Sequence, residues 1–188
     1  MRVFDVCFSL LVLLLGSPIF FIVAVITKLT SKGSVFFSQA RTGRNGTRFM
    51  IHKFRSMCAG ASQGHAAADD ADDRITPWGR FMRKTRLDEI PQFYNVLKGE
   101  MSIVGPRPLA DYDVQTLMEV APDEFKQILV VKPGITSIGQ VKFGYARTAF
   151  EMKKRLRYDL FYLKKISFFF DLWLIAYTIV DMVKGKGK

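Results

Sequence analysis

The pattern of hydrophobic positions begins with one long apolar run. Residues 6–27 contain no charged side chain and are rich in Leu, Val, Ile and Phe, and the run is bounded by Asp5 and Lys28. As a helix, such a run is long enough to cross the roughly 30 Å hydrocarbon core of a bilayer. It is longer than the core of a typical signal peptide, and no small-residue cleavage site follows it. We therefore expect this segment to stay attached as a membrane helix.

Gly16, Ser17 and Pro18 interrupt the run near its middle. Proline removes a backbone donor and bends a helix, and the Ser17 hydroxyl can bond to a carbonyl that the bend exposes. A strong bend would return the chain to its starting face as a re-entrant helix. Cations stand on both sides of the run, so charge does not identify an external end. From the residues alone, a spanning helix with a tolerated kink is at least as strongly favoured.

Beyond residue 30 the pattern changes to short polar and apolar stretches punctuated by glycine. Strand-like segments at residues 34–39 and 48–54 flank a turn over residues 43–46 and predict a β-hairpin. Residues 59–73 are typical of a solvated acidic loop. Helical spacing of apolar residues then predicts helices around residue 80, from about 90 to 98, from 112 to about 130, and over 151–165.

A second apolar stretch covers residues 167–183 and contains Asp171 and Asp181. It is too short and too charged to make a good spanning helix. Its aromatic side chains and the lysines that follow it suit a helix at the membrane interface, attracted to anionic lipid. A buried core helix is the alternative.

Composition and charge narrow the range of partners. The 188 residues carry a formal net charge of +11, so nucleic acid, anionic lipid or a phosphorylated substrate is expected to bind. The hydrophobic content of 49% is enough for one modest core. The only cysteines, Cys7 and Cys58, lie in unlike contexts, which indicates neither a disulfide framework nor a zinc site and favours a reducing compartment.

Asp88 and Glu89 form an adjacent acid pair directly downstream of Arg83, Lys84 and Arg86. Carboxylates beside fixed positive charge stay ionised at neutral pH, and they can act as nucleophiles, metal ligands or bases. Taken alone, a solvated acid pair at the start of a helix is the simpler interpretation, because the helix dipole favours acidic residues there.

Arg107 lies between Pro106 and Pro108, which restrict the backbone on both of its sides. A rigid arginine can bind an anionic oxygen with little loss of entropy. A proline-rich turn with an exposed cation fits the same residues.

Five short motifs follow one another along the chain. They are Lys-Phe-Arg-Ser-Met at 53–57, Leu-Asp-Glu-Ile-Pro-Gln at 87–92, Asn-Val-Leu-Lys-Gly-Glu-Met-Ser at 95–102, Val-Gly-Pro-Arg-Pro at 104–108 and Lys-Pro-Gly-Ile-Thr at 132–136. In these motifs and their order, the chain resembles the bacterial sugar transferases, which are monotopic polyprenol-phosphate phosphoglycosyl transferases. The resemblance covers nearly the whole chain. The simpler interpretations of the acid pair and of Arg107 therefore lose most of their weight.

The resemblance implies an activity and a location. Members of this family transfer a phospho-sugar from a UDP-sugar to undecaprenyl phosphate, with release of UMP, at the cytoplasmic face of the bacterial inner membrane. The reaction initiates the synthesis of glycoconjugates such as exopolysaccharide, O-antigen, capsule or glycoprotein glycans, and it needs Mg²⁺. The implied partners are these two substrates and anionic membrane lipids, without nucleic acid. A homodimer is one option for the oligomeric state.

The resemblance also implies roles for individual residues. The family's nucleophilic aspartate, which forms a covalent phospho-sugar intermediate and is an expected metal contact, falls on Asp88, and its neighbour falls on Glu89. Basic residues near the phosphates correspond to Lys53, Arg83 and Arg107. Weaker candidates for phosphate binding are Arg55 and Arg86, and Arg147 is a candidate replacement for an arginine that many relatives carry after a Gln-Val pair.

The break at Ser17 and Pro18 matches a serine-proline break in the family's membrane helix, which is re-entrant. The resemblance therefore favours a re-entrant helix over the spanning helix that the residues alone favoured. The expected architecture is α+β and mostly helical. It comprises a re-entrant membrane helix (1–30), a cytoplasmic catalytic domain with a small β-hairpin (31–166) and an interfacial helix with a basic tail (167–188). Because larger relatives carry further membrane helices and another domain before this unit, the sequence is either that of a minimal enzyme or that of a shortened larger relative.

Two other functional classes fit parts of the sequence. A membrane-anchored basic module that binds nucleic acid or anionic lipid would explain the charge, but no nucleic-acid motif is present. A purely structural membrane scaffold would explain the apolar ends and would not require Asp88. Neither accounts for the five motifs.

Overall fold

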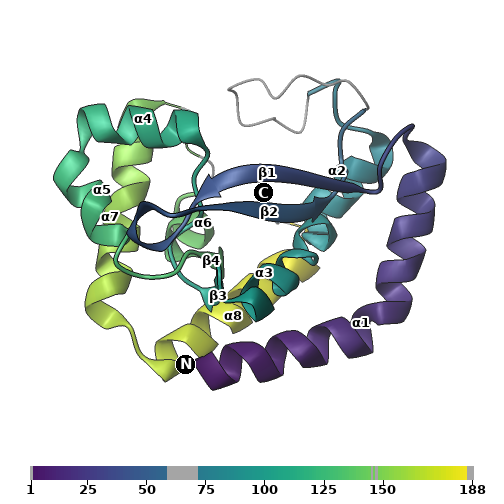
Figure 1. The fold of residues 1–188 in the computed structure, drawn as a ribbon, viewed down its shortest axis with the longest axis horizontal. Helices are drawn as coiled ribbons and strands as arrows, with labels where there is room; N and C mark the ends of the chain where they lie inside the picture. The colour runs from purple at the N-terminus through teal and green to yellow at the C-terminus, as the bar shows by residue number, and fades with distance from the viewer. Residues whose placement is uncertain (1, 59–71, 145, 147, 186–188) are drawn as a thin grey trace.

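The computed structural model describes residues 2–58, 72–144, 146 and 148–185. The order of its elements is α1 (Arg2–Thr30), β1 (Phe36–Thr42), the 3-10 turn η1 (Arg44–Gly46), β2 (Arg48–Phe54), α2 (Pro77–Thr85), the 3-10 turn η2 (Leu87–Glu89), α3 (Gln92–Lys98), β3 (Ser102–Val104), α4 (Asp111–Val120), α5 (Pro122–Ile128), β4 (Gly134–Thr136), α6 (Ile138–Lys142), α7 (Ala149–Lys165) and α8 (Phe168–Val183). The predicted α+β, mostly helical class is confirmed (Figure 1). Most of the predicted acidic loop at 59–73 lies outside the described residues.

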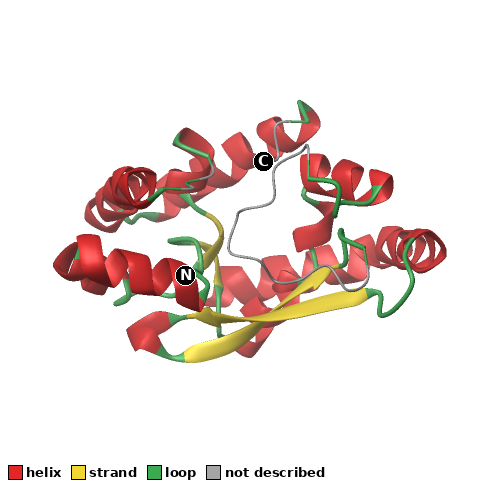
Figure 2. Cartoon of the chain, turned by 90° about the horizontal axis from the view of Figure 1, so that it is seen from above, coloured by secondary structure: helices red, strands yellow, loops and turns green. Residues whose placement is uncertain are grey.

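The predicted β-hairpin is present. Strands β1 and β2 pair antiparallel, with Phe36 opposite Phe54 and Thr42 opposite Arg48. In the connecting turn Asn45 adopts a left-handed conformation with φ 55°, which asparagine tolerates better than most residues. Strand β1 begins two residues later than predicted and continues to Thr42. The hairpin lies along one side of the molecule, as the view from above shows (Figure 2).

A second small sheet fixes the loop that carries Arg107. Strand β3 pairs parallel with β4, with Ser102 opposite Gly134. A Cβ atom on Gly134 would lie 2.1 Å from the backbone nitrogen of Gly105, so only glycine permits this approach. The loop after β3 is thereby held against β4, and it leads directly to Arg107.

The prediction of one helix from 112 to about 130 is wrong. The segment forms two helices, α4 and α5, separated at Ala121, whose φ and ψ of −157° and 56° are not helical. Pro122 explains the break because proline cannot donate the backbone hydrogen bond needed inside a helix, whereas it suits the first turn of a new one.

Helix α1 is bent at the predicted place. Pro18 lies inside the helix, and the Ser17 hydroxyl donates a hydrogen bond of 2.8 Å to the carbonyl of Leu14. That carbonyl is the one that a residue with an N–H at position 18 would have bonded, so the hydroxyl replaces the missing donor. Figure 1 shows α1 as two straight halves joined by a sharp bend. The hydrogen bond predicted for the Ser17 hydroxyl is therefore present.

The first end of α1 packs on the rest of the protein through polar contacts. The Arg2 guanidinium donates to the carbonyls of Val96 and Leu97 at the end of α3, at 2.7 Å for Leu97. The Asp5 carboxylate accepts from the Ser102 hydroxyl at 2.8 Å and from the backbone N–H of Ile103 at 3.2 Å. This end is thereby joined to α3 and β3.

The second end of α1 packs on α2. The indole N–H of Trp78 donates to the Thr27 hydroxyl at 3.1 Å, and Thr27 also lies 3.8 Å from the Met82 sulfur. Val23 is buried beside Phe54 and Met82. Between the two ends, large apolar side chains around the bend are exposed, among them Leu14, Leu15 and Phe21 at 71–73%. Both ends of α1 therefore contact the same domain, while its middle does not.

Helix α8 has one buried and one exposed apolar face. Leu174 is fully buried in the main core, and Asp171 accepts a hydrogen bond of 2.9 Å from the Tyr162 hydroxyl on α7. On the other face, Phe169 and Trp173 are 81% and 44% exposed. The helix thus belongs to the core and also presents aromatic side chains outward.

Candidate active site

The acid pair lies in the tight turn η2 between α2 and α3. Arg86 adopts a left-handed conformation with φ 54° and ends α2, so the chain turns sharply there. This turn carries Asp88 and Glu89 inward, where each residue is only 7% exposed. The pair is therefore not a solvated start of a helix, and helix α3 begins only at Gln92.

Glu89 is enclosed by three cations. Its Oε1 accepts a hydrogen bond of 2.7 Å from Lys53 Nζ and lies 3.4 Å from an Arg107 nitrogen, while Arg86 lies 3.9 Å from Oε2. These four side chains are 6–17% exposed. Burial opposes the ionisation of Glu89, but Lys53, Arg107 and Arg86 outweigh it and hold its pKa well below the usual range. Glu89 is thus a fixed negative charge.

Asp88 has a different environment from its neighbour. Among the described residues, none donates a hydrogen bond to its carboxylate. Burial raises the pKa of Asp88 to about 6; repulsion by Glu89 adds to the rise, while the charges of Lys53, Arg83 and Arg107 oppose it. With this pKa the carboxylate is mostly ionised at neutral pH, but it is buried and accepts no hydrogen bond from the described residues. A desolvated carboxylate of this kind is suited to nucleophilic attack.

Arg83 completes the cationic surroundings of Asp88. It projects from the last turn of α2, its Nε donates a hydrogen bond of 3.0 Å to the Ser56 hydroxyl, and its charge acts on Asp88. The structure therefore brings together around the acid pair all three basic residues that the sequence predicted most strongly, Lys53, Arg83 and Arg107.

The weaker candidates lie in different places. Arg86 faces Glu89. Arg55 donates a hydrogen bond of 3.1 Å to the carbonyl of Lys32, in the connection after α1, and no ion pair joins it to Glu89 within the described chain. Arg147 lies outside the described residues.

Gln140 contacts the site although the sequence did not indicate it. The Arg107 guanidinium donates a hydrogen bond of 2.8 Å to its side-chain oxygen. Gln140 is 6% exposed and belongs to the short helix α6, which begins where the Ser137 hydroxyl accepts from the Gln140 backbone N–H at 3.0 Å. Arg107 is therefore held between Glu89 on one side and α6 on the other.

Arg41 is a second residue that the sequence prediction missed. It lies on β1 opposite Phe49, and residues opposite one another in an antiparallel pair project from the same face. That face also carries Lys53, which lies opposite Phe37. The strand alternation of the predicted hairpin could have placed Arg41 beside the site.

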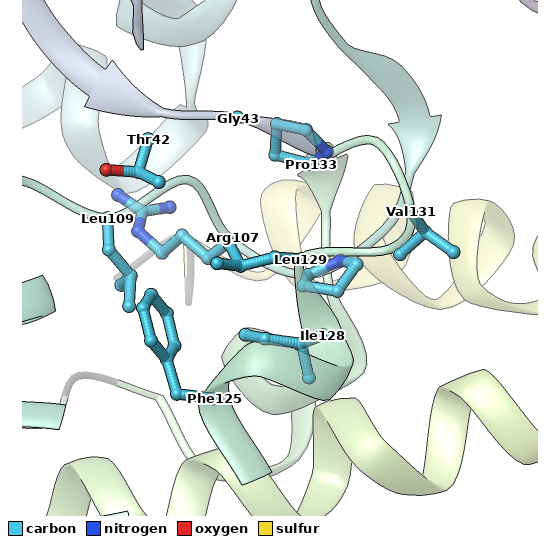
Figure 3. Close-up of a pocket in the computed structure, with 10 residues that line it drawn as sticks. Thr42, Gly43, Arg107, Leu109, Phe125, Ile128, Leu129, Val131 and Pro133 are labelled. Carbon is cyan, nitrogen blue, oxygen red and sulfur yellow. The ribbon is translucent and has the colours of Figure 1, made fainter. Parts of the chain in front are cut away.

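A small hollow adjoins Arg107, and neither Asp88 nor Glu89 lines it. It has a volume of about 10 Å³, roughly enough for one water molecule, and its lining includes Thr42, Phe125 and Pro133. Figure 3 shows the Arg107 guanidinium pointing toward Thr42 above this hollow. The hollow is too small for a sugar nucleotide, so the chemistry of the site resides in the charged cluster itself.

The acid pair fits a magnesium ion that is shared with a substrate. Among the described residues, no group of three or more His, Cys, Asp or Glu side chains could hold a metal without other ligands. Protein-bound Mg²⁺ commonly takes one or two carboxylates and completes its shell with substrate phosphates and water. Asp88 has a carboxylate available for such a site, and Oε2 of Glu89 accepts no hydrogen bond from the described residues.

The protein is mostly helical, and its buried acid pair is enclosed by cations. Among the described residues, one helix, α1, is long enough and apolar enough to cross a membrane. The chain belongs to the bacterial sugar transferase family, whose model matches residues 1–185.

Three relatives illustrate the match. The chain is 38% identical over 190 residues to the UDP-N-acetylgalactosamine-undecaprenyl-phosphate N-acetylgalactosaminephosphotransferase of Aeromonas hydrophila, covering 99% of this chain and 44% of the relative. It is 39% identical over 197 residues to the UDP-glucose:undecaprenyl-phosphate glucose-1-phosphate transferase of Escherichia coli, covering 99% and 40%. The exopolysaccharide production protein PSS of Rhizobium leguminosarum is 37% identical over 193 residues, covering 99% and 96%. The chain thus spans less than half the length of the first two relatives.

Proposed function

We propose that this protein transfers a phospho-sugar from a UDP-sugar to undecaprenyl phosphate, releases UMP, and so initiates the synthesis of a glycoconjugate. The observation that carries the proposal is the buried Asp88 carboxylate, which has no hydrogen-bond donor among the described residues and lies among cations suited to phosphate. The named functions of two relatives, which transfer sugar phosphates to undecaprenyl phosphate, supply the substrate classes.

The reaction would proceed in two displacements at one phosphorus atom. In the first, a carboxylate oxygen of Asp88 attacks the phosphorus that bears the sugar, and the bond from this phosphorus to the bridging oxygen breaks. UMP leaves with the bonding electron pair, and an aspartyl phospho-sugar remains. In the second, an oxygen of undecaprenyl phosphate attacks the same phosphorus and releases the Asp88 carboxylate.

The surrounding residues would bind and orient the phosphates. Lys53, Arg83 and Arg107 supply positive charge where negative charge accumulates on the phosphoryl oxygens. Glu89 accepts hydrogen bonds from Lys53 and Arg107 and holds both cations in place. When bound, Mg²⁺ would be held by Asp88 and would neutralise part of the diphosphate charge.

The contacts of α1 support a re-entrant attachment to the cytoplasmic leaflet. Both ends of the helix pack on one domain, the bend lies at Pro18, and the exposed apolar side chains surround the bend. A straight helix of 29 residues would place its two ends about 43 Å apart, which exceeds the thickness of the hydrocarbon core of a bilayer. The exposed aromatic face of α8 would lie at the membrane interface.

Release of UMP tests the proposed function. With undecaprenyl phosphate and Mg²⁺, the purified protein is expected to release UMP from at least one member of a panel of UDP-sugars and to form a lipid-linked diphosphate sugar. Chelation of the metal should stop the reaction because the diphosphate charge would no longer be neutralised. The measurement is UMP formation together with chromatography of the lipid product. Failure with every UDP-sugar in the panel would contradict the proposal.

The orientation of α1 gives a separate prediction. Val3 and Leu29 are 77% and 81% exposed at opposite ends of the helix. Single cysteines at these positions, in a chain with Cys7 and Cys58 replaced by serine, should both be protected in intact spheroplasts and both react with a membrane-impermeant maleimide in inverted vesicles. Reaction of one position from each side would instead show a spanning helix.

A further inference from the structure

Arg41 is a partly buried cation at the Arg107 end of the site. Among the described residues it makes no ion pair within 4.0 Å, and its Nε is buried without a hydrogen-bond partner. Its other nitrogens donate to the Gln39 side chain at 2.7 Å and to the Pro108 carbonyl at 3.5 Å. Even partial burial of an arginine without a carboxylate or phosphate partner is costly, and a bound anion would offset that cost.

The charges around Arg41 show that it lies in a positive region. Burial lowers its pKa to about 10, repulsion by Arg107 and Arg155 adds to the fall, and Asp113 and Glu89 oppose it. Glu89 is already shared among Lys53, Arg107 and Arg86. Among the described residues, no carboxylate therefore pairs directly with the positive charge of Arg41.

The backbone holds Arg41 next to Arg107. The N–H of Thr42 donates a hydrogen bond of 3.0 Å to the carbonyl of Leu109, which joins the end of β1 to the loop that carries Arg107. On the inner face of the hairpin, Lys53 lies opposite Phe37, and Arg41 lies four positions after Phe37 on the same strand. Four residues of a strand span about 13 Å. Arg41 thus extends the row of cations beyond Arg107.

The opposite end of the row lies beside α1. Arg83 follows Met82, and the Met82 sulfur contacts Thr27 of α1. The charges of Arg83 and Arg107 both act on Asp88. The row therefore runs from Arg83 near α1, past Asp88 and Arg107, to Arg41. A lipid phosphate that approaches along the membrane helix would meet the Arg83 end first.

We infer that Arg41, together with Arg107, binds the phosphate that remains on the nucleotide half of the donor and leaves as UMP. The inference rests on the proposed function and assigns one part of its substrate to one end of the site. The guanidinium carries five N–H donors in a fixed plane, and Gln39 and Pro108 use only two of them, so it can donate to a phosphate in a geometry that lysine cannot reproduce. Gln39 and Pro108 fix the orientation of that guanidinium before the nucleotide binds.

Binding of UMP in the absence of lipid tests the inference without turnover. Arg41→Gln and Arg41→Lys should each weaken UMP binding in calorimetry, by about ten- to a hundredfold for the glutamine variant. Arg48→Gln is the matched control, because Arg48 lies on the same hairpin with its side chain 70% exposed and paired to Asp111 at the surface. The control should bind UMP as tightly as the unaltered protein.

Steady-state kinetics separate the two phosphates. Arg41→Lys should raise KM for the UDP-sugar and leave KM for undecaprenyl phosphate unchanged. Because this variant keeps the positive charge, it can be tested even if Arg41→Gln fails to fold. A rise in KM for undecaprenyl phosphate alone would assign Arg41 to the lipid phosphate and overturn the inference. Unchanged UMP binding in both variants would overturn it while leaving the proposed function intact. Absence of UMP binding by the unaltered protein would overturn the inference, whereas failure to release UMP from any UDP-sugar would overturn the proposed function as well.

Discussion

Asp88→Asn is expected to lower the rate of UMP release by about three orders of magnitude or more while leaving the protein folded. The amide has nearly the shape of the carboxylate, but it cannot form the bond to phosphorus. Exposed Asp123 provides the control, because Asp123→Asn changes the same functional group away from the site and should keep the full rate. Release by Asp88→Asn at the unaltered rate would contradict the assignment of the nucleophile.

Asp88→Asn should maintain or raise the thermal stability of the protein. The pKa of Asp88 rises on folding from 3.8 to about 6, so the folded protein favours the protonated form. The stability associated with this proton is fully present below pH 3.8 and is lost as the pH rises through about 6. At neutral pH the ionised carboxylate therefore destabilises the fold, and a neutral amide relieves that cost. Differential scanning fluorimetry in detergent measures the effect as Tm.

The titration of Asp88 also predicts the pH dependence of the first displacement. In the absence of lipid, the burst of UMP should fall as the pH drops below about 6, because the attacking carboxylate becomes protonated. Omission of the lipid matters, since the monoester phosphate of undecaprenyl phosphate titrates in the same region. A burst amplitude and rate that stay constant down to pH 4.5 would place the nucleophile elsewhere.

Local chemistry accounts for what the sequence predicted correctly. The bend in α1 depends on Pro18 and on a hydroxyl one residue away, and the hairpin depends on strand alternation and the turn between its strands. The one clear error, a single helix across Pro122, came from extending an apolar period through a residue that cannot continue a helix.

Long-range packing accounts for what the sequence could not show. The burial of Glu89 depends on Lys53, which precedes it by 36 residues, and on Arg107, which follows it by 18. No local pattern joins these residues, and only the family motifs suggested that they meet. Gln140 was missed because its contact with Arg107 arises from the packing of α6, whereas the alternation of the predicted strands could have placed Arg41.

Adjacent residues in one turn thus have opposite electrostatic environments. Asp88 is buried without a hydrogen-bond donor among the described residues, so its charged form is disfavoured, while Glu89 is buried among three cations, so its charged form is favoured. Environments that separate the pKa values of two neighbouring acids are a common basis for giving them different roles. In the proposed mechanism, they separate the attacking carboxylate of Asp88 from Glu89, which holds the cations proposed to bind phosphate.

Glu89→Gln is therefore expected to have the opposite effect on stability from Asp88→Asn. The amide keeps the shape of Glu89 but leaves three buried cations without their shared anion, which should cost about 3–5 kcal/mol of the free energy of unfolding. Activity should fall as well, because Lys53 and Arg107 would lose the group that orients them. Denaturation in detergent measures the stability, and UMP release measures the activity.

Glu119→Gln is the matched control for this change, because Glu119 is exposed on α4 and its substitution should alter the free energy of unfolding by less than about 0.5 kcal/mol. The pH dependence supplies an independent readout. The pKa of Glu89 is lowered on folding, so its contribution to stability is complete above the unfolded value of 4.5 and is lost as the pH falls further. The deficit of Glu89→Gln relative to the unaltered protein should consequently be largest at neutral pH and shrink in acid. A variant as stable as the unaltered protein at pH 7 would show that the cations are held in place by packing rather than by the charge of Glu89.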